Sequence, residues 1–174
     1  ICTEYALKVL KRFSEILNVS KITNLKIIAT AVLREATDTK PFINEVEKLF
    51  KTKINILSGE EEAECSAEGV KIGFENVNGL VADLGGGSLE LARVENNIVT
   101  NKTSLPVGVL RLLNNPIVKK RNLAKYIKKL LREEKWLSKK KFNNLYLVGG
   151  TWRALFKLHL FQNDHPVHII HQYN

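Results

Sequence analysis

The chain has 174 residues, of which 44% are hydrophobic and 26% charged, the balance of a soluble globular protein. No apolar run reaches the roughly 18 residues of a membrane span, and the charged first 17 residues do not read as a secretory signal, so we expect a cytoplasmic protein without membrane contact. The sequence contains no methionine, so we expect that Ile1 is not the natural start. Cys2 and Cys65 lack metal-ligand spacing and are expected to be reduced packing residues.

The net charge of +9 arises in one segment, residues 119–141, which holds eleven Lys or Arg against two Glu. A basic helix can steer a polyanion such as nucleic acid, acidic lipid or polyphosphate. A solvated, lysine-rich helix face is the alternative reading. Nucleic acid is the least supported partner, because Tyr126 and Trp136 are the segment's only stacking aromatics.

The first 76 residues alternate helices and strands, which is typical of an α/β lobe with parallel pairing. Helical spacing of apolar residues predicts a helix over 2–17, and Thr39 with Pro41 begins another. Short apolar runs at 25–30 and 54–57 predict buried strands. A capping box from Ser58 to Glu61 predicts a further helix over about 60–72.

From residue 77 the pattern changes, and we place a domain boundary there. Strands over 79–84, 88–94 and 98–104 are separated by a glycine turn and an Asn-rich turn, which predicts an antiparallel β-meander. A basic amphipathic helix follows, with four apolar residues facing inward: Leu123, Ile127, Leu130 and Leu131. A strand over 145–148 then leads through Gly149 and Gly150 into a helix capped by Thr151.

The strongest chemical signal is VADLGGGS, residues 81–88. Asp83 ends a buried strand, and Gly85, Gly86, Gly87 and Ser88 follow. Glycine allows the left-handed dihedrals and close approach by which successive N–H groups point at one anion, and an acid beside such a turn can hold a metal or a water. A flexible hairpin turn is the alternative, although it needs neither a third glycine nor a buried aspartate.

Three other features are ambiguous when taken alone. The four acids of residues 58–64 either compensate a helix dipole or orient an attacking water. Arg34, directly after a strand, either clamps phosphate or pairs with Glu35. Gly149, Gly150 and Thr151 form either an anion site at a helix start or a packing turn.

The four histidines are a weak metal signal. His165, His168 and His171 gather near the C-terminus, and His159 precedes them. Their spacing spans Pro166 and an apparent strand, so they need not share a face, and we expect no metal there.

Taken in order, the motifs ATAVLREA, INILSGEEEAE, VADLGGGSLEL, SLPVGVLRL and VGGTWRALFKLH resemble the exopolyphosphatase / guanosine pentaphosphate phosphohydrolase (Ppx/GppA) family. The resemblance implies an actin-like ATPase (ribonuclease H-like) two-lobed α/β fold with the active site between the lobes. It also implies removal of the terminal phosphate of inorganic polyphosphate or guanosine pentaphosphate with Mg²⁺.

Residue by residue, the resemblance makes Glu62 catalytic and Asp83 its partner and the metal ligand. It assigns phosphate binding to Arg34 and to residues 85–88. Gly149, Gly150 and Thr151 match a second-lobe glycine corner, at which related kinases bind adenosine.

The family's opening D-x-G-S-N-S motif is absent, so we expect a core fragment truncated at both ends. In this reading residues 1–76 are the C-terminal part of lobe one and residues 77–174 the N-terminal part of lobe two. The full-length protein could form a homodimer, and its partner is a polyanionic phosphate substrate.

Two rival functions stay open. One is a kinase or ATPase of the same fold, which would need an adenosine pocket and an acceptor site. The other is a module that binds guanosine polyphosphates without hydrolysing them. The sequence does not separate polyphosphate from guanosine pentaphosphate, and the fragment could be inactive without the first phosphate loop.

Overall fold

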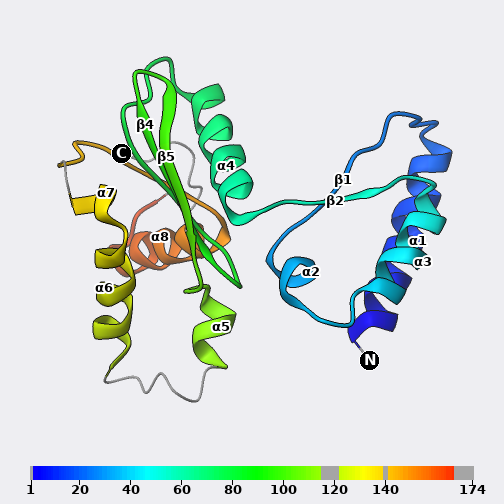
Figure 1. Ribbon diagram of the computed structural model, residues 1–174. Helices are drawn as coiled ribbons and strands as arrows, with labels where there is room; N and C mark the ends of the chain where they lie inside the picture. Colours follow the sequence, from blue (N-terminus) through cyan, green and yellow to red (C-terminus); the bar gives the residue numbers. More distant parts are fainter. Residues whose placement is uncertain (1, 115–121, 139–140, 167–174) are drawn as a thin grey trace. The chain divides into compact units, whose positions relative to one another are not determined.

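The computed structural model describes residues 2–114, 122–138 and 141–166 (Figure 1). The chain divides into two compact units between Ser58 and Gly59. Each unit has its own sheet, and each is described by itself below.

The first unit holds the α/β alternation that the sequence predicts. Helix α1 (Cys2–Val19) packs on α3 (Lys40–Phe50), while strands β1 (Ile27–Ala29) and β2 (Ile54–Ile56) pair in parallel. A one-turn helix, α2 (Ala31–Glu35), follows β1 directly. The sequence does not predict α2, because five residues are too few to show a helical period.

The second unit is built on a four-stranded sheet of order β5-β4-β3-β6. Strands β3 (Gly79–Leu84), β4 (Leu89–Glu95) and β5 (Ile98–Leu105) form the predicted antiparallel meander, and β6 (Leu145–Val148) pairs in parallel with β3.

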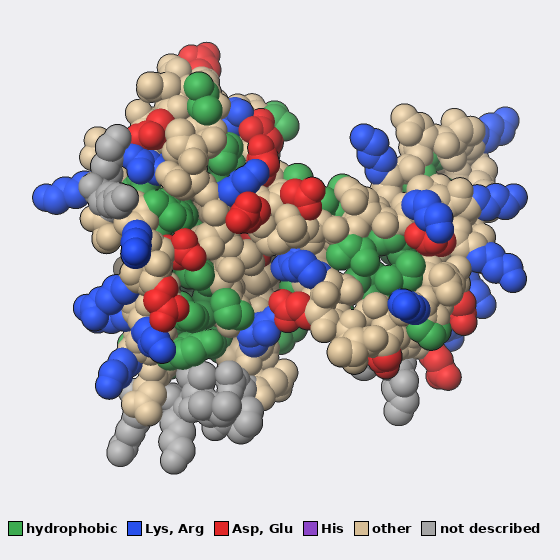
Figure 2. Space-filling model, viewed as in Figure 1, with side chains coloured by type: hydrophobic (Ala, Val, Ile, Leu, Met, Phe, Trp, Pro, Cys, Tyr) green, Lys and Arg blue, Asp and Glu red, His purple; other side chains and the backbone are tan. Residues whose placement is uncertain are grey.

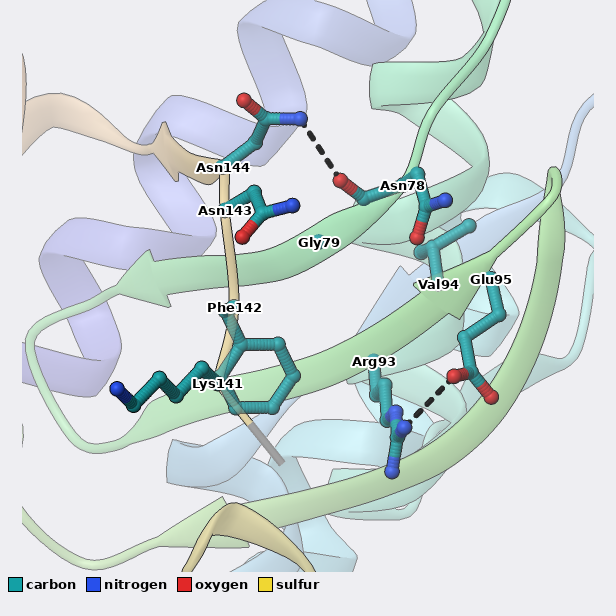
Figure 3. A pocket seen from close by; sticks show the side chains of 9 residues that line it. All are labelled: Asn78, Gly79, Arg93, Val94, Glu95, Lys141, Phe142, Asn143 and Asn144. Atoms are coloured by element: carbon teal, nitrogen blue, oxygen red, sulfur yellow. Dashed lines mark hydrogen bonds and ion pairs between the residues drawn. The ribbon is translucent and has the colours of Figure 1, made fainter. Parts of the chain in front are cut away.

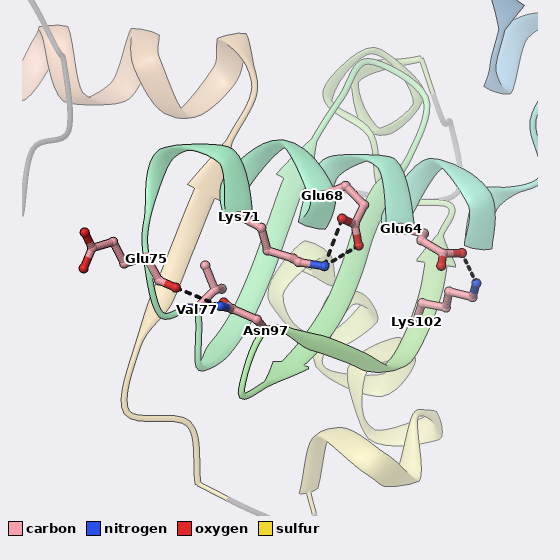
Figure 4. Close-up of polar contacts among 7 residues, drawn as sticks. All are labelled: Glu64, Glu68, Lys71, Glu75, Val77, Asn97 and Lys102. Atoms are coloured by element: carbon pink, nitrogen blue, oxygen red, sulfur yellow. Dashed lines mark hydrogen bonds and ion pairs between the residues drawn. The ribbon is translucent and has the colours of Figure 1, made fainter.

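The predicted Asn-rich turn between β4 and β5 is confirmed. Asn96 and Asn97 have φ of 50° and 63°, left-handed values that asparagine tolerates. The Asn97 side chain donates to the Glu75 carbonyl and accepts from the Val77 N–H, both at 2.7 Å (Figure 4). It thereby ties the turn to the segment that enters β3.

Helix α4 (Gly59–Gly73) covers one face of this sheet. Ala63 and Ala67 are buried against four residues of the segment before β3 and of the strands: Val77, Val81, Ala92 and Val94. Because α4 packs on this sheet, the two units divide earlier than the boundary expected at residue 77. Cys65 is exposed on α4, so the expectation that it packs in a core is wrong.

The other face of the sheet is covered by α6 (Leu123–Glu133) and α7 (Lys135–Ser138). Ile127, Leu130 and Leu131 pack on Ala82 and Leu91 there, as the apolar spacing predicts. Figure 2 shows Lys and Arg side chains over α6 on the outside.

The basic segment is not one helix, because it breaks at Glu134. That carboxylate accepts hydrogen bonds from Thr103 and Trp136, both at 3.0 Å. The contacts fix the end of α6 against the sheet. The remainder of the expected basic segment, at 119–121 and 139–140, lies outside the described residues.

Two helices follow glycines. Helix α5 (Val109–Leu113) begins after Gly108, and α8 (Gly150–Gln162) begins after Gly149. The predicted cap at Thr151 is wrong, because Gly149 is the N-cap and Thr151 lies inside the first turn. Among the described residues no helix is long and apolar enough to cross a bilayer.

Candidate active site

A row of polar side chains crosses three neighbouring strands of the second unit. Asp83 of β3 lies opposite Glu90 of β4, and Glu90 lies opposite Ser104 of β5. Directly opposed residues of antiparallel strands point to the same face of a sheet. Ser104 donates to Glu90 at 2.7 Å, so the row is a connected group.

Helix α4 brings two more polar residues to this row. Ser66 Oγ donates to Asp83 Oδ2 at 2.7 Å. Glu62 lies four residues earlier, on the same side of the helix as Ser66. It is half-buried, whereas Glu60 and Glu61 are exposed. Two helix positions and two strands thus bring Glu62, Ser66, Asp83 and Glu90 together.

Glu90 is a site residue that the sequence analysis missed. It is only 2% exposed. Burial raises its pKa, hydrogen bonds from Ser88 and Ser104 oppose that shift, and the nearby charges of Glu62 and Asp83 add to it. A signal was present: the alternation of residues 88–94 places Glu90 on the same face as the apolar Ala92 and Val94.

The four acids in the first two turns of α4 divide into two groups. Glu64 forms an ion pair with Lys102 of β5 (Figure 4). That hydrogen bond raises the pKa of Lys102 against the opposing effect of burial, and the charges of Glu64, Glu60 and Glu61 add to it. The charge of Glu62 instead raises the pKa of Glu90. The environment therefore distinguishes Glu62 from its neighbours.

The glycine loop is held from one side by α5. The Gly85 carbonyl accepts from Val109 at 3.1 Å, and the Gly86 carbonyl accepts from Leu110 and Arg111 at 2.9 and 3.1 Å. The Gly87 carbonyl accepts from Arg111 Nε at 2.6 Å. All three glycine carbonyls are occupied.

These contacts orient the opposite side of the loop. In a trans peptide the N–H points away from the preceding carbonyl, and there are no cis peptide bonds. The N–H groups of residues 86–88 therefore point away from α5. Among the described residues they have no hydrogen-bond acceptor, which is the arrangement of an anion-binding nest.

Of the two reasons expected for glycine in this loop, left-handed dihedrals and close approach, the structure does not show the first. Positive φ occurs at Gly79 and Gly149 among the described glycines, and not at residues 85–87. Close approach occurs at Gly86 of the loop and at Gly108, which lies against it. A Cβ on Gly108 would lie 2.2 Å from the Gly87 carbonyl carbon, and one on Gly86 would lie 3.1 Å from Leu110.

Ser88 and the second glycine corner both lie beside the carboxylate row. Ser88 is 4% exposed and its side chain hydrogen-bonds Glu90, so its hydroxyl already has a partner in the carboxylate row. Gly149 lies against Asp83, and a Cβ there would be 2.7 Å from Oδ1. The corner of Gly149, Gly150 and Thr151 thus adjoins the carboxylate row.

Arg34 lies in the first unit. Its Nη1 donates to the Leu57 carbonyl at 2.7 Å, which ties the end of α2 to the end of β2. Its contact with phosphate stays a prediction.

No metal cluster of three or more His, Cys, Asp or Glu residues occurs in the described part of the chain. His159 lies on α8 and hydrogen-bonds Asn163. His168 and His171 lie outside the described residues.

A separate cavity of about 130 Å³ lies at the opposite end of β3, beside Gly79 (Figure 3). Arg93 lines this cavity. Its guanidinium pairs with Glu95 at 2.6 Å and lies 5.8 Å from the centre of the Phe142 ring. None of the site residues expected from the sequence lines this cavity.

Comparison with known proteins gives a consistent result. Residues 2–172 match the model of the Ppx/GppA phosphatase family. A guanosine-5'-triphosphate,3'-diphosphate pyrophosphatase of Aeromonas hydrophila is 39% identical over 107 residues, 61% of this chain and 22% of that protein. A bifunctional 3-dehydroquinate synthase/phosphatase of Fusobacterium nucleatum is 33% identical over 163 residues, 85% of this chain and 24% of that protein.

Solved structures agree on the fold. An exopolyphosphatase from Cytophaga hutchinsonii superposes with a TM-score of 0.81 at 23% identity, over 95% of this chain and 56% of that one. The Ppx/GppA family member of Aquifex aeolicus gives 0.70 at 23% identity, over 95% and 55%. The α/β fold implied by the sequence motifs is therefore confirmed, and the chain spans only part of each relative.

Proposed function

This chain belongs to the Ppx/GppA phosphatase family, and we propose that the protein carrying it hydrolyses the terminal phosphoanhydride bond of guanosine pentaphosphate, inorganic polyphosphate or both. One observation carries the proposal: outward-pointing N–H groups of the glycine loop adjoin a row of carboxylates. A nest of N–H groups suits a phosphate, and a carboxylate beside it suits an attacking water.

In the proposed reaction, water attacks the terminal phosphorus in line with the leaving phosphate. Glu62 orients this water and accepts its proton, because it is half-buried on the side of α4 that also carries Ser66, the residue that hydrogen-bonds Asp83. The N–H groups of residues 86–88 stabilise charge on the phosphoryl oxygens. Arg34 adds a charge-assisted contact to the phosphate.

The donor set is compatible with Mg²⁺. This ion keeps several waters and takes one or two carboxylates together with substrate phosphates, so it needs no cage of three protein ligands. Asp83, with Glu90 directly opposite, offers such a pair of oxygen ligands. Bound there, Mg²⁺ would offset the charge of the phosphate and of the crowded carboxylates.

The names of relatives support the two substrates. The Aeromonas protein is a guanosine-5'-triphosphate,3'-diphosphate pyrophosphatase and the Cytophaga structure is an exopolyphosphatase. Both substrates end in a phosphoanhydride, so one site can serve either. A kinase or ATPase remains the second candidate, and it would be supported by thermal protection with ATP but not with polyphosphate.

The decisive experiment compares Glu62→Gln, Glu61→Gln and Glu60→Gln in the complete polypeptide. Loss of the base at Glu62 should lower phosphate release by roughly 10²–10⁴-fold, with little change in KM. Glu60→Gln and Glu61→Gln should keep nearly full activity and cost at most about 1 kcal/mol of stability.

The assay is phosphate release from each substrate with Mg²⁺. Equal, mild effects at all three glutamates would contradict the catalytic assignment, and a large loss at Glu61 alone would move the base by one position. Arg34→Ala, measured alongside, should raise KM as well as lower turnover, because it removes a ground-state contact.

A further inference from the structure

We propose that Ser66 is a positioning residue, which together with Gly149 holds the Asp83 carboxylate in one orientation for the reaction. The inference rests on the proposed function, because it concerns the same carboxylate row. It gives a role to Ser66 and to Gly149, neither of which belongs to the phosphate loop.

The first contact restrains one oxygen. Ser66 Oγ donates to Asp83 Oδ2 at 2.7 Å, the ordinary length of an O–H···O bond. Both side chains are half-buried, so water competes less for the bond than it would at the surface. The χ2 torsion of an aspartate is broad, and a directed hydroxyl is a direct way to narrow it.

The second feature makes room for the other oxygen. Gly149 has φ +107°, and a Cβ there would lie 2.7 Å from Asp83 Oδ1. Carbon and oxygen cannot approach so closely, so only glycine lets Oδ1 occupy this place. Helix α8 starts at the next residue, which brings the positive end of a 13-residue helix close to the carboxylate.

The Ser66 bond also sets the distance between the two acids on which the mechanism depends. Glu62 and Ser66 are one helical turn apart on the same side of α4. Because Ser66 anchors that side to Asp83, it fixes where Glu62 lies along the carboxylate row. Loss of the hydroxyl would loosen both acids while leaving the phosphate loop, held by α5, in place.

The test uses Ser66→Ala and Ser66→Thr in the complete polypeptide, with Cys65→Ala as a control on the exposed side of the same helix. Ser66→Ala should lower kcat by roughly 10- to 100-fold, the usual effect of removing a supporting hydrogen bond, while KM changes by less than about twofold. Ser66→Thr keeps the hydroxyl and should recover most of the loss. Cys65→Ala should match the parent protein.

A double variant separates positioning from a general loss of stability. If both residues act through Asp83, the effects of Ser66→Ala and Gly149→Ala on kcat should be less than additive, with melting temperatures confirming that each variant is folded. A parent-like kcat for Ser66→Ala in an active protein would overturn this inference alone. A parent protein that releases no phosphate from either substrate would overturn the proposed function and this inference with it.

Discussion

Glu90 combines deep burial with two hydrogen-bond partners, Ser88 and Ser104, and two negative neighbours. Its pKa is raised, first by burial and then by the charges of Glu62 and Asp83. Perturbed carboxylates of this kind are typical of functional sites. The buried charge lowers the stability of the free protein, and a bound cation would offset it.

The raised pKa of Glu90 predicts a pH-dependent stability. Because the pKa of Glu90 is higher in the folded state than in the unfolded state, the folded state holds the Glu90 proton more tightly. The free energy of unfolding therefore falls as pH rises from about 4.5 through the raised pKa. Glu90→Gln removes this loss, so the variant should be more stable than the parent at pH 7 and should lose that advantage at pH 4.

Melting temperatures across pH 4–8 provide the measurement for Glu90. Glu60→Gln is the matched control, because Glu60 is exposed, and its curve should run parallel to that of the parent. The same Glu90→Gln protein should release far less phosphate. Parallel curves for Glu90→Gln and the parent would contradict a pKa raised by burial at Glu90.

Helix α5 is short but determines the direction of the phosphate loop. Removing Arg111 deletes the 2.6 Å bond to the Gly87 carbonyl, and a single such bond from a charged donor contributes about 1.5–3 kcal/mol. Arg111→Ala should therefore raise KM several-fold and lower the melting temperature. Arg12→Ala, at an exposed position of α1, should change neither, and an unaltered KM for Arg111→Ala would count against the loop as the phosphate contact.

Helix α6 offers the clearest electrostatic prediction. Lys128 and Lys129 are exposed, and Lys129 has only a 3.8 Å pair with Glu133. Their replacement by Gln should weaken binding of long polyphosphate and flatten its salt dependence, with a smaller effect on short substrates. Lys8→Gln with Lys11→Gln on α1 gives the same charge change elsewhere, and equal effects of the two pairs would return α6 to a solvated face.

Most elements could be predicted from the sequence, because apolar periodicity and turn residues are local signals. The meander, its Asn96–Asn97 turn and the inward side of α6 were predicted for this reason. The motif resemblance also assigned catalytic roles to Glu62 and Asp83, and those roles stay predictions. Ser66, Ser104 and Arg111 were missed because their roles depend on partners 14 to 24 residues away, and no local pattern reports such pairs.

At the scale of the whole molecule, the two units differ in how completely their apolar side chains are buried. The first unit has one pair of parallel strands, and several of its apolar side chains are exposed: Ile22 (51%), Ile28 (56%), Val32 (76%) and Ile56 (37%). Two strands rarely suffice for independent stability, and open edges invite pairing with other chains. The second unit has cores on both faces of its sheet.

Expressed by itself, this chain should therefore self-associate and melt in two steps, with the first unit unfolding at the lower temperature. Sedimentation velocity and scanning calorimetry measure the two properties. Ile28→Lys should reduce association without altering the second melting step. A monodisperse monomer with one cooperative transition would show that the first unit is adequately covered in this chain.

The spacing of Glu62 and Ser66 on α4 has a consequence for how this sequence can change over evolutionary time. One residue inserted between them would rotate one relative to the other by about 100°, so length is constrained there even where side-chain identity is not. The Asn96–Asn97 hairpin lies at the opposite end of the strands from the carboxylate row. Gains and losses of residues should accumulate at that hairpin, while the four-residue interval of α4 keeps its length.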